Sequence, residues 1–295
     1  MDLVVGSTGL VGQQVAIGLR QRGRQVRGMV RGGKNHEKSE PLISAGIEIV
    51  DADLTKPETR SSACVGIETV VCTATSMPHG REDGLRRVDQ EGILGLIENA
   101  ERAGVRHFVY ISYSGNIREE SPLETAKRSC ENRLLSGHLR ATILRPSYFM
   151  EVWLSPALGF DPASGRARIC GSGDSQVSYI SLNDVASFAL AAAANPPDKS
   201  VVLELGGPEP LSQLDAVRIF ERALGKKMEL DHVPVAALSE QHRSSDPLQK
   251  TFAALMLAYA KGDVISGSLE TARHYGIKLR PVADYAATFS KAATA

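Results

Sequence analysis

The sequence has few of the residues that build disulfide frameworks or metal centres. Its 295 residues include four cysteines, Cys64, Cys72, Cys130 and Cys170, and no two of them form a CxxC pair. This spacing disfavours a disulfide framework and a zinc site, and it predicts a reducing compartment. The seven histidines have no metal-ligand spacing, so we expect no metal ion.

The chain also lacks an excess of charge of one sign. Lys and Arg total 34, Asp and Glu total 34, and the formal net charge is +0. A neutral chain has no bulk attraction to nucleic acid or to an anionic membrane, and we expect neither partner. No apolar run approaches membrane-spanning length, and a first strand that begins at residue 3 leaves no room for a signal peptide. We therefore expect a cytoplasmic monomer or homodimer that acts on a small molecule.

A glycine-rich turn between a short apolar run and a helical pattern is the most informative stretch that is present. Residues 3–5 predict a buried strand, helical periodicity follows the turn, and residues 25–30 predict a second strand. In this context small residues let the backbone approach a pyrophosphate, and the start of a helix binds anions. The spacing is G-x-x-G-x-x-G, not G-x-G-x-x-G, and the alternative is a connection without a ligand. The predicted cofactor contacts are Gly6, Thr8, Gly9, Leu10, Val11 and Gly12.

The residues after the second strand predict which dinucleotide is bound. A free ribose 2′-hydroxyl is usually held by Asp or Glu about 20 residues beyond the glycines, whereas Arg suits a 2′-phosphate. Here Arg31 holds that position, Lys34 follows it, and no acidic residue appears before Glu37. Guanidinium groups bind phosphate oxygens well, so we expect NADP(H) over NAD(H). The alternative is that Arg31 and Lys34 are ordinary surface bases.

Strands alternate with helices over the first 145 residues, which predicts βαβ units. The fold class is therefore α/β, a doubly wound parallel sheet of Rossmann type with a smaller C-terminal α/β substrate domain. We expect an NADP(H)-binding domain over 1–150, a substrate domain over 151–295, and a return of 179–205 to the first domain. Residues 159–175 are rich in glycine, arginine and serine, and we assign no element to them. The six predicted strands of the first domain are 3–5, 25–30, 47–50, 69–73, 107–112 and 141–144.

Ligands of open α/β sheets lie beyond the carboxyl ends of the strands, so the residues that follow each strand are candidates. Asp53 follows the third strand, where a carboxylate can reach an adenine amino group; the alternative is a simple turn residue. The residues after the fourth strand, from Thr73 on, are expected to line the adenosine ribose. The further cofactor candidates at these positions are Leu54, Thr73, Ala74, Thr75, Ser112, Pro146, Ser147 and Phe149.

Several stretches together resemble the NmrA-like family of atypical short-chain dehydrogenases/reductases, over roughly residues 1–235. The resemblance implies a Rossmann-type domain, a smaller substrate domain and NADP(H) binding. Enzymes of the family include quinone, phenylcoumaran-type and dye reductases, and other members are redox-sensing regulators that bind the dinucleotide. The stretches are GSTGLVG (6–12), FVYISYSG (108–115), Lys127-x-x-x-Glu131, TILRPSYFME (142–151), YISLNDVA (179–186) and LELGGPEPLS (203–212).

The chain departs from the conventional short-chain dehydrogenases at one catalytic position. These enzymes pair a Tyr with a Lys four residues later, but four residues before Lys127 stands Leu123, which cannot exchange a proton. Similarity to the NmrA-like reductases implies reliance on Lys127, which would stabilise developing charge or shuttle a proton. The alternatives are a lysine that only binds the ribose, and an exposed lysine paired with Glu131. Tyr113 is a candidate substitute donor, or else a pocket wall.

An apolar cluster follows the sixth strand. Phe149, Met150 and Trp153 lie within five residues, although aromatic residues make up only 5% of the chain. They are expected to form a wall beside the nicotinamide, and packing between the domains is the alternative. The predicted substrate contacts are Tyr113, Ser114, Phe149 and Trp153.

These features favour an NADPH-dependent reductase of a small, mostly apolar quinone, carbonyl or conjugated substrate. The cofactor would supply the hydride, and the protein would supply binding, orientation and a polarising group. A non-catalytic NADP(H)-sensing protein is the second hypothesis, favoured by the missing Tyr. An epimerase-like enzyme is a third, weakened by the same loss.

Overall fold

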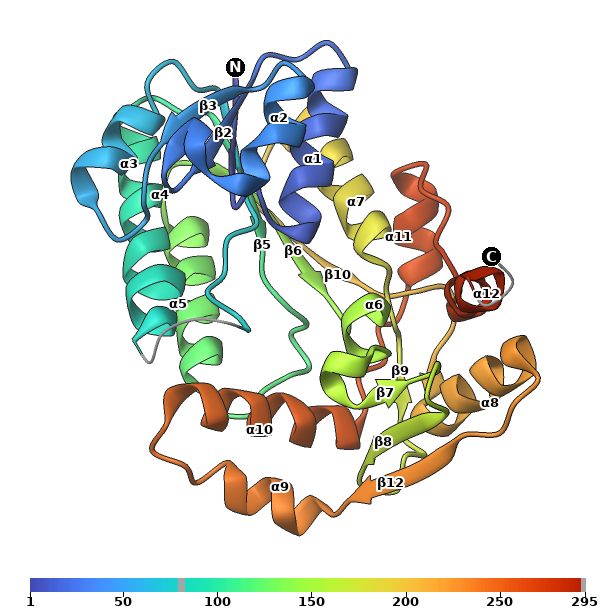
Figure 1. Ribbon diagram of the computed structural model, residues 1–295. Coiled ribbons are helices and arrows are strands. Elements are labelled where there is room, and N and C mark those ends of the chain that lie inside the picture. Colours follow the sequence, from blue (N-terminus) through green and yellow to red (C-terminus); the bar gives the residue numbers. More distant parts are fainter. Residues whose placement is uncertain (79–82, 293–295) are drawn as a thin grey trace. The chain divides into compact units, whose positions relative to one another are not determined.

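The computed structural model describes residues 1–78 and 83–292 and forms two compact units (Figure 1). The first unit contains residues 1–112, 122–144 and 185–203. The second contains 113–121, 145–184 and the described chain from 204 onward. The expected boundary was residue 150, whereas the second unit includes residues 113–121 and begins again at 145. The segment that returns to the first unit is 185–203.

A parallel sheet forms the centre of the first unit. In the described chain it has seven strands in the order β10-β6-β5-β4-β1-β2-β3, and the pairs from β3 to β6 are all parallel. This is the strand order of a Rossmann fold, so the predicted fold class is confirmed. The strands are β1 Asp2–Val5, β2 Val26–Val30, β3 Glu48–Asp51, β4 Thr69–Cys72, β5 His107–Ile111, β6 Arg140–Pro146 and β10 Val201–Leu205.

Helices cover the sheet of the first unit on two faces (Figure 1). The face with α3, α4 and α5 holds a continuous core, and on the other face Gly18 of α1 packs directly on Leu190 of α7. The predicted helix over 83–102 is two segments, a π-helical turn η3 and then α4. The elements are α1 Leu10–Gln21, η1 Gly33–Asn35, η2 Glu37–Ser39, α2 Glu40–Ser44, α3 Pro57–Ala63, η3 Leu85–Gly92, α4 Ile93–Arg102, α5 Pro122–Ser136 and α7 Leu182–Ala194.

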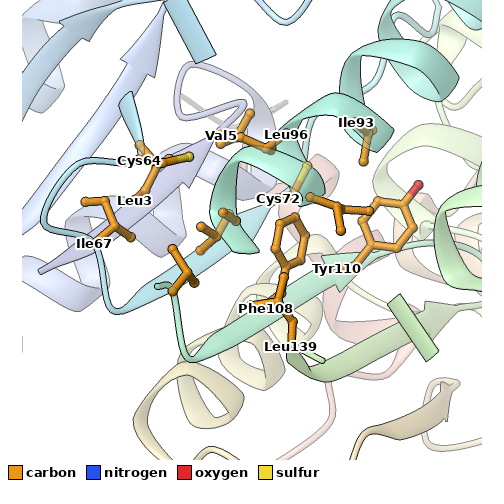
Figure 2. Packing of buried hydrophobic residues seen from close by; sticks show 14 of the residues in the cluster. Leu3, Val5, Cys64, Ile67, Cys72, Ile93, Leu96, Phe108, Tyr110 and Leu139 are labelled. Atoms are coloured by element: carbon orange, nitrogen blue, oxygen red, sulfur yellow. The ribbon is translucent and has the colours of Figure 1, made fainter. Parts of the chain in front are cut away.

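The core of the first unit lies between the middle strands and the helices α4 and α5 (Figure 2). Phe108 and Tyr110 point from β5 into this layer, beside Cys72 of β4, and all three side chains are fully buried. Strands that are buried on both faces read as short apolar runs, which is why the sequence located them well. Burial of each large apolar side chain stabilises the fold by about 1.5–3 kcal/mol.

Among the described residues, the second unit contains two small sheets and most of the C-terminal helices. The strand β8 was not expected, because Arg166 and Arg168 interrupt a glycine-rich stretch; they point outward, while Ala167 and Ile169 alternate into the core. Its strands are β7 Phe160–Asp161, β8 Arg166–Cys170 and β12 Glu229–Val233 in one sheet, and β9 Gln176–Val177 and β11 Leu211–Ser212 in the other. Its helices are α6 Met150–Trp153, η4 Pro156–Leu158, α8 Gln213–Leu224, α9 Val235–Gln241, α10 Pro247–Lys261, α11 Ser268–His274 and α12 Val282–Ala292.

Among the described residues, no helix has the length and apolar character needed to span a bilayer.

A buried histidine on β5 makes stability depend on pH. His107 is 1% exposed, its Nε2 lies 3.0 Å from Thr142 Oγ1, and burial, followed by the charges of Arg140 and Arg24, lowers its pKa to about 4. The unfolded chain binds a proton near pH 6.5, so between pH 6.5 and 4 it takes up a proton that the native state excludes. The stabilisation that comes from keeping His107 neutral is therefore fully present above pH 6.5, and it is lost as the pH falls from 6.5 toward 4.

We expect the free energy of unfolding to fall by about 2–3 kcal/mol through His107 between pH 7 and pH 4.5. Urea denaturation of wild type and His107→Asn at both pH values measures this contribution, because the substitution removes the titrating ring. An equal loss in both proteins would contradict the prediction.

Candidate functional site

The glycine turn connects β1 to α1 and packs against the end of β4. Gly6 has φ of +81°, which L side chains rarely adopt, and its carbonyl accepts a hydrogen bond of 2.9 Å from Gly9 N. A Cβ at Gly6 would lie 2.8 Å from Ala74 N, and one at Gly12 would overlap the Gly6 carbonyl. Thr73 Oγ1 donates to the Val5 carbonyl at 3.1 Å and fixes the same turn. The fold itself therefore requires Gly6 and Gly12.

Substitution of Gly12 by alanine is expected to destabilise the first unit by about 1–3 kcal/mol, because the added methyl group overpacks the turn against a backbone oxygen. A Cβ at Gly9 meets only that oxygen, at 3.2 Å, so Gly9→Ala is a matched control with a smaller effect. Urea denaturation measures both variants. Equal stabilities would show that the turn can relax around Gly12.

The start of α1 has the features of an anion site. Helix geometry leaves its first N–H groups without acceptors in the helix, and Gly9 at the N-cap offers no side chain to cap them. No acidic residue lies in the first turn. Leu10 is 68% exposed, unusual for a large apolar residue, while Val11 and Gly12 are buried. Exposed N–H groups and the helix dipole both favour a bound anion here.

Two basic side chains follow β2. Arg31 and Lys34 are both exposed, on a turn in which Gly32 N donates to Asp51 Oδ1 at 2.9 Å. Within the described part of the chain neither forms a salt bridge, so both charges are available to a ligand. Gly33, with φ of +61°, lies directly on Asp51 and shapes this turn.

Asp53 supports the turn after β3. Its Oδ1 accepts hydrogen bonds of 2.8 Å from both the N–H and the hydroxyl of Thr55, as an Asx turn does. Burial acts to raise the pKa of Asp53, but the Thr55 bonds and then the charge of Arg31 outweigh it and lower the pKa. The alternative that Asp53 is a simple turn residue therefore accounts for one of its two carboxylate oxygens, Oδ1. Leu54 is buried, and a Cβ at Gly92 would meet it at 2.9 Å.

The residues after β4 differ in their surroundings: some support the glycine turn, and others are exposed to solvent. Thr73 is occupied by the glycine turn, as described, and Ala74 is half-buried against Gly6. Thr75 is exposed and accepts a hydrogen bond from Met77 N at 3.2 Å. Of the three candidates, only Thr75 presents a freely exposed side chain.

Ser112 and Lys127 lie at the carboxyl end of β5. Lys127 is 5% exposed, and its Nζ donates to the Ile111 carbonyl at 3.1 Å and lies 5.0 Å from the centre of the Tyr110 ring. Ser112 is buried, and its Oγ has no hydrogen-bond partner among the described residues. A buried ammonium and an unsatisfied hydroxyl beside a strand end suit a polyhydroxylated ligand.

The alternative of an exposed Lys127 paired with Glu131 is wrong. Lys127 is buried, and the Glu131 carboxylate accepts from Arg128 Nη1 at 2.7 Å. Leu123 is buried on the same helix, so no hydroxyl stands at the position of the conventional Tyr.

Sequence reasoning missed Asp89, on the π-helical turn η3. It is fully buried, and its Oδ2 accepts from Ser76 N at 2.8 Å and from Ser76 Oγ at 2.5 Å. A single acidic residue on a predicted amphipathic helix reads as part of the solvated face. Nothing in the sequence around Asp89 distinguishes it from a solvated carboxylate.

The remaining candidates belong to the second unit. Tyr113 is half-buried and packs against the core of that unit. Ser114 is fully buried and donates to Asp263 Oδ1 at 2.8 Å, and its N–H donates to the Pro146 carbonyl at 2.9 Å. These contacts make Ser114 an anchor of its loop, and the expected substrate contact is not supported. Ser147 is buried too, and its N–H donates to the Leu205 carbonyl at 2.8 Å.

The aromatic candidates differ in their surroundings. Phe149 is half-buried and pairs with Ile180 in an isolated bridge. Trp153 is half-buried with its ring centre 4.6 Å from those of Tyr148 and Tyr259. Trp153 is therefore part of an aromatic cluster within the second unit, whereas the contact given above for Phe149 is made by its backbone.

The described residues contain no group of three or more His, Cys, Asp or Glu side chains able to hold a metal ion.

The strand order, the glycine turn and the uncapped start of α1 define a Rossmann-type α/β protein. The model of the NmrA-like family matches residues 3–274, and the chain belongs to this family. This confirms the resemblance that the sequence motifs indicated.

Curated relatives carry two kinds of name. The chain is 31% identical over 242 residues to the photosystem II assembly factor Ycf39 of Trieres chinensis, covering 80% of this chain and 73% of the relative. It is 26% identical over 277 residues to an NAD(P)H azoreductase of Xenophilus azovorans, covering 92% and 91%. The relatives therefore include both an assembly factor and a reductase.

Solved structures share the fold over nearly the whole chain. The NADPH-dependent quinone oxidoreductase QOR2 of Escherichia coli, complexed with NADPH, has a TM-score of 0.80 at 21% identity and covers 98% of this chain and 99% of its own. The triphenylmethane reductase of Citrobacter sp., complexed with NADP(H), has a TM-score of 0.76 at 22% identity and covers 98% and 100%.

Proposed function

We propose that the protein is an NADPH-dependent reductase of a small, mostly apolar quinone, carbonyl or conjugated substrate. The observation that carries this proposal is the buried Lys127 ammonium at the carboxyl end of β5, in a unit that also has the glycine turn. A buried charge is costly, so its retention at the ligand-binding edge of a Rossmann sheet is typical of a functional group.

The residues present fit NADP(H). The uncapped N-terminus of α1 suits the pyrophosphate, and the exposed Arg31 and Lys34 suit the 2′-phosphate. The unpartnered Ser112 Oγ and the Lys127 amine suit the hydroxyls of a ribose. Relatives and structural neighbours named for NAD(P)H, NADPH or NADP(H) support the same cofactor.

The bound cofactor would supply the hydride. Lys127 would hold the nicotinamide ribose and place a positive charge where negative charge develops on the substrate. Tyr113 follows Ser112 directly in the chain and is the candidate hydroxyl donor. Phe149 would contribute apolar surface to the substrate.

A second candidate is a non-catalytic NADP(H)-binding protein that acts through a partner. The assembly-factor name of the relative at 31% identity favours it, and so does Leu123 in place of a catalytic Tyr.

The two candidates are separated by measuring NADPH binding and NADPH oxidation with the same preparation. We expect micromolar binding by calorimetry and oxidation at 340 nm with at least one of a panel of quinones, azo dyes, aldehydes and enones. Binding without turnover on any substrate would favour the non-catalytic protein. No binding of oxidised or reduced nucleotide would overturn both.

A further inference from the structure

The interior of the first unit contains two opposite charges that form no salt bridge in the described chain. Asp89 is fully buried on η3, and Lys127 is 5% exposed on α5. Asp89 Oδ2 accepts both hydrogen bonds from Ser76, but Oδ1 has no partner among the described residues. Within the same residues, Lys127 donates to the backbone carbonyl of Ile111. Neither charge is therefore balanced by a contacting group.

Both charges border the same buried side chains. Cys72 and Tyr110 are partners across β4 and β5 and lie side by side in the core (Figure 2). Lys127 Nζ lies over the Tyr110 ring, and the Asp89 carbonyl accepts from Cys130 Sγ at 3.4 Å. The backbone of Asp89, on η3, and the Lys127 ammonium, on the α5 helix that packs against η3, therefore border the same group of buried side chains.

The electrostatics of the two buried thiols agree with this placement. Burial raises the pKa of Cys72 to about 12 and that of Cys130 to about 11. On each thiol the charge of Lys127 acts to lower the pKa, and the charge of Asp89 acts to raise it. Both charges thus act within the same small volume.

The buried acid closest to Lys127 along α5 has its own basic partner. Glu131, one turn along α5 from Lys127, is buried with Arg128 as its salt-bridge partner. An uncompensated buried charge costs several kcal/mol, so a counter-charge at short range strongly stabilises each of the two ions.

We propose that Asp89 is the counter-charge of Lys127: Oδ2 anchors the loop after β4 through Ser76, and Oδ1 balances the Lys127 ammonium through a bridging water. Asp89 is then a positioning residue that stabilises the Lys127 ammonium and keeps it directed to the carboxyl end of β5. Its bearing on catalysis rests on the proposed function, but the charge pair itself does not.

The test compares Asp89→Asn with Ser76→Ala. Asparagine can still accept both Ser76 hydrogen bonds but has lost the charge, whereas Ser76→Ala weakens the loop anchor and leaves the carboxylate. Reductive methylation of the protein without nucleotide, at pH 7, reacts with neutral amines, and mass spectrometry gives the rate at Lys127. We expect that rate to rise about tenfold in Asp89→Asn and less than twofold in Ser76→Ala, at similar melting temperatures.

Turnover supplies a second readout. In Asp89→Asn, kcat is expected to fall about tenfold, while the Kd for NADPH stays within about threefold of wild type. An unchanged Lys127 methylation rate in Asp89→Asn, or equal changes in both variants, would overturn the proposal. If the wild type neither binds NADPH nor turns over, the proposed function fails, and the methylation rates still decide the charge pair.

Discussion

Lys127→Ala is expected to lower kcat for a quinone or azo substrate by about 100-fold or more, the usual contribution of a positioned acid–base group. Alanine removes the ammonium that lies at the end of β5 and leaves the Ile111 carbonyl without its donor. The apolar surroundings of Lys127 make the loss larger than at a solvated site, because water does not replace the missing charge well. Stopped-flow measurement of NADPH oxidation reports the hydride-transfer step directly.

Two controls separate catalysis from binding and folding. Lys199→Ala removes an exposed lysine elsewhere in the first unit and should leave kcat unchanged. Lys127→Arg keeps the charge in a larger group and should retain more activity than alanine. If Lys127→Ala transferred hydride at the wild-type rate, Lys127 would have only a ribose-binding role or none, and Tyr113→Phe would become the decisive variant.

Arg31→Ala is expected to raise the Kd for NADPH by about 30-fold and to leave the Kd for NADH within twofold. A charge-assisted hydrogen bond to phosphate contributes about 1.5–3 kcal/mol, and only NADPH carries the 2′-phosphate. Arg31 is exposed, and its charge acts on Asp53, so it lies at the adenosine end of the proposed site. Fluorescence titration with both nucleotides gives the ratio.

The double variant Arg31→Ala with Lys34→Ala should weaken NADPH binding further. Arg102→Ala, which removes a solvated arginine from the end of α4, is the matched control. An unchanged ratio of the two Kd values in Arg31→Ala would support the alternative that these are ordinary surface bases, and the preference for NADP(H) would then need another source.

The first half of the fold could be predicted because its signals are local. Buried parallel strands are short apolar runs, and the helices between them show the period of 3.6 residues, so 2–5, 26–30 and 107–111 were found within a residue or two. The glycine turn could be predicted equally well, because the structure restricts the residue type at two of its positions. Gly6 has a positive φ, and a Cβ at Gly12 would overlap a backbone oxygen.

The candidate site was predictable where position along a strand decides function, and not where burial does. Arg31, Ser112 and Lys127 follow or flank strand ends, and the topology brings such residues to one edge of the sheet. Ser114 also follows the end of a strand, β5. Its hydroxyl, however, is buried and donates to Asp263, 149 residues away, so Ser114 anchors its loop. Strand β8 was missed because its pairing with β12, and not its own composition, stabilises it.

By itself, the sequence determined the Rossmann architecture, the glycine turn and the absence of the usual Tyr, since each is indicated by residues within a few positions of one another. Only the tertiary structure decided which polar side chains lose water. The burial of Asp89 and Lys127 in one layer depends on how η3 and α5 pack together, and a charge is costly where its surroundings cannot solvate it.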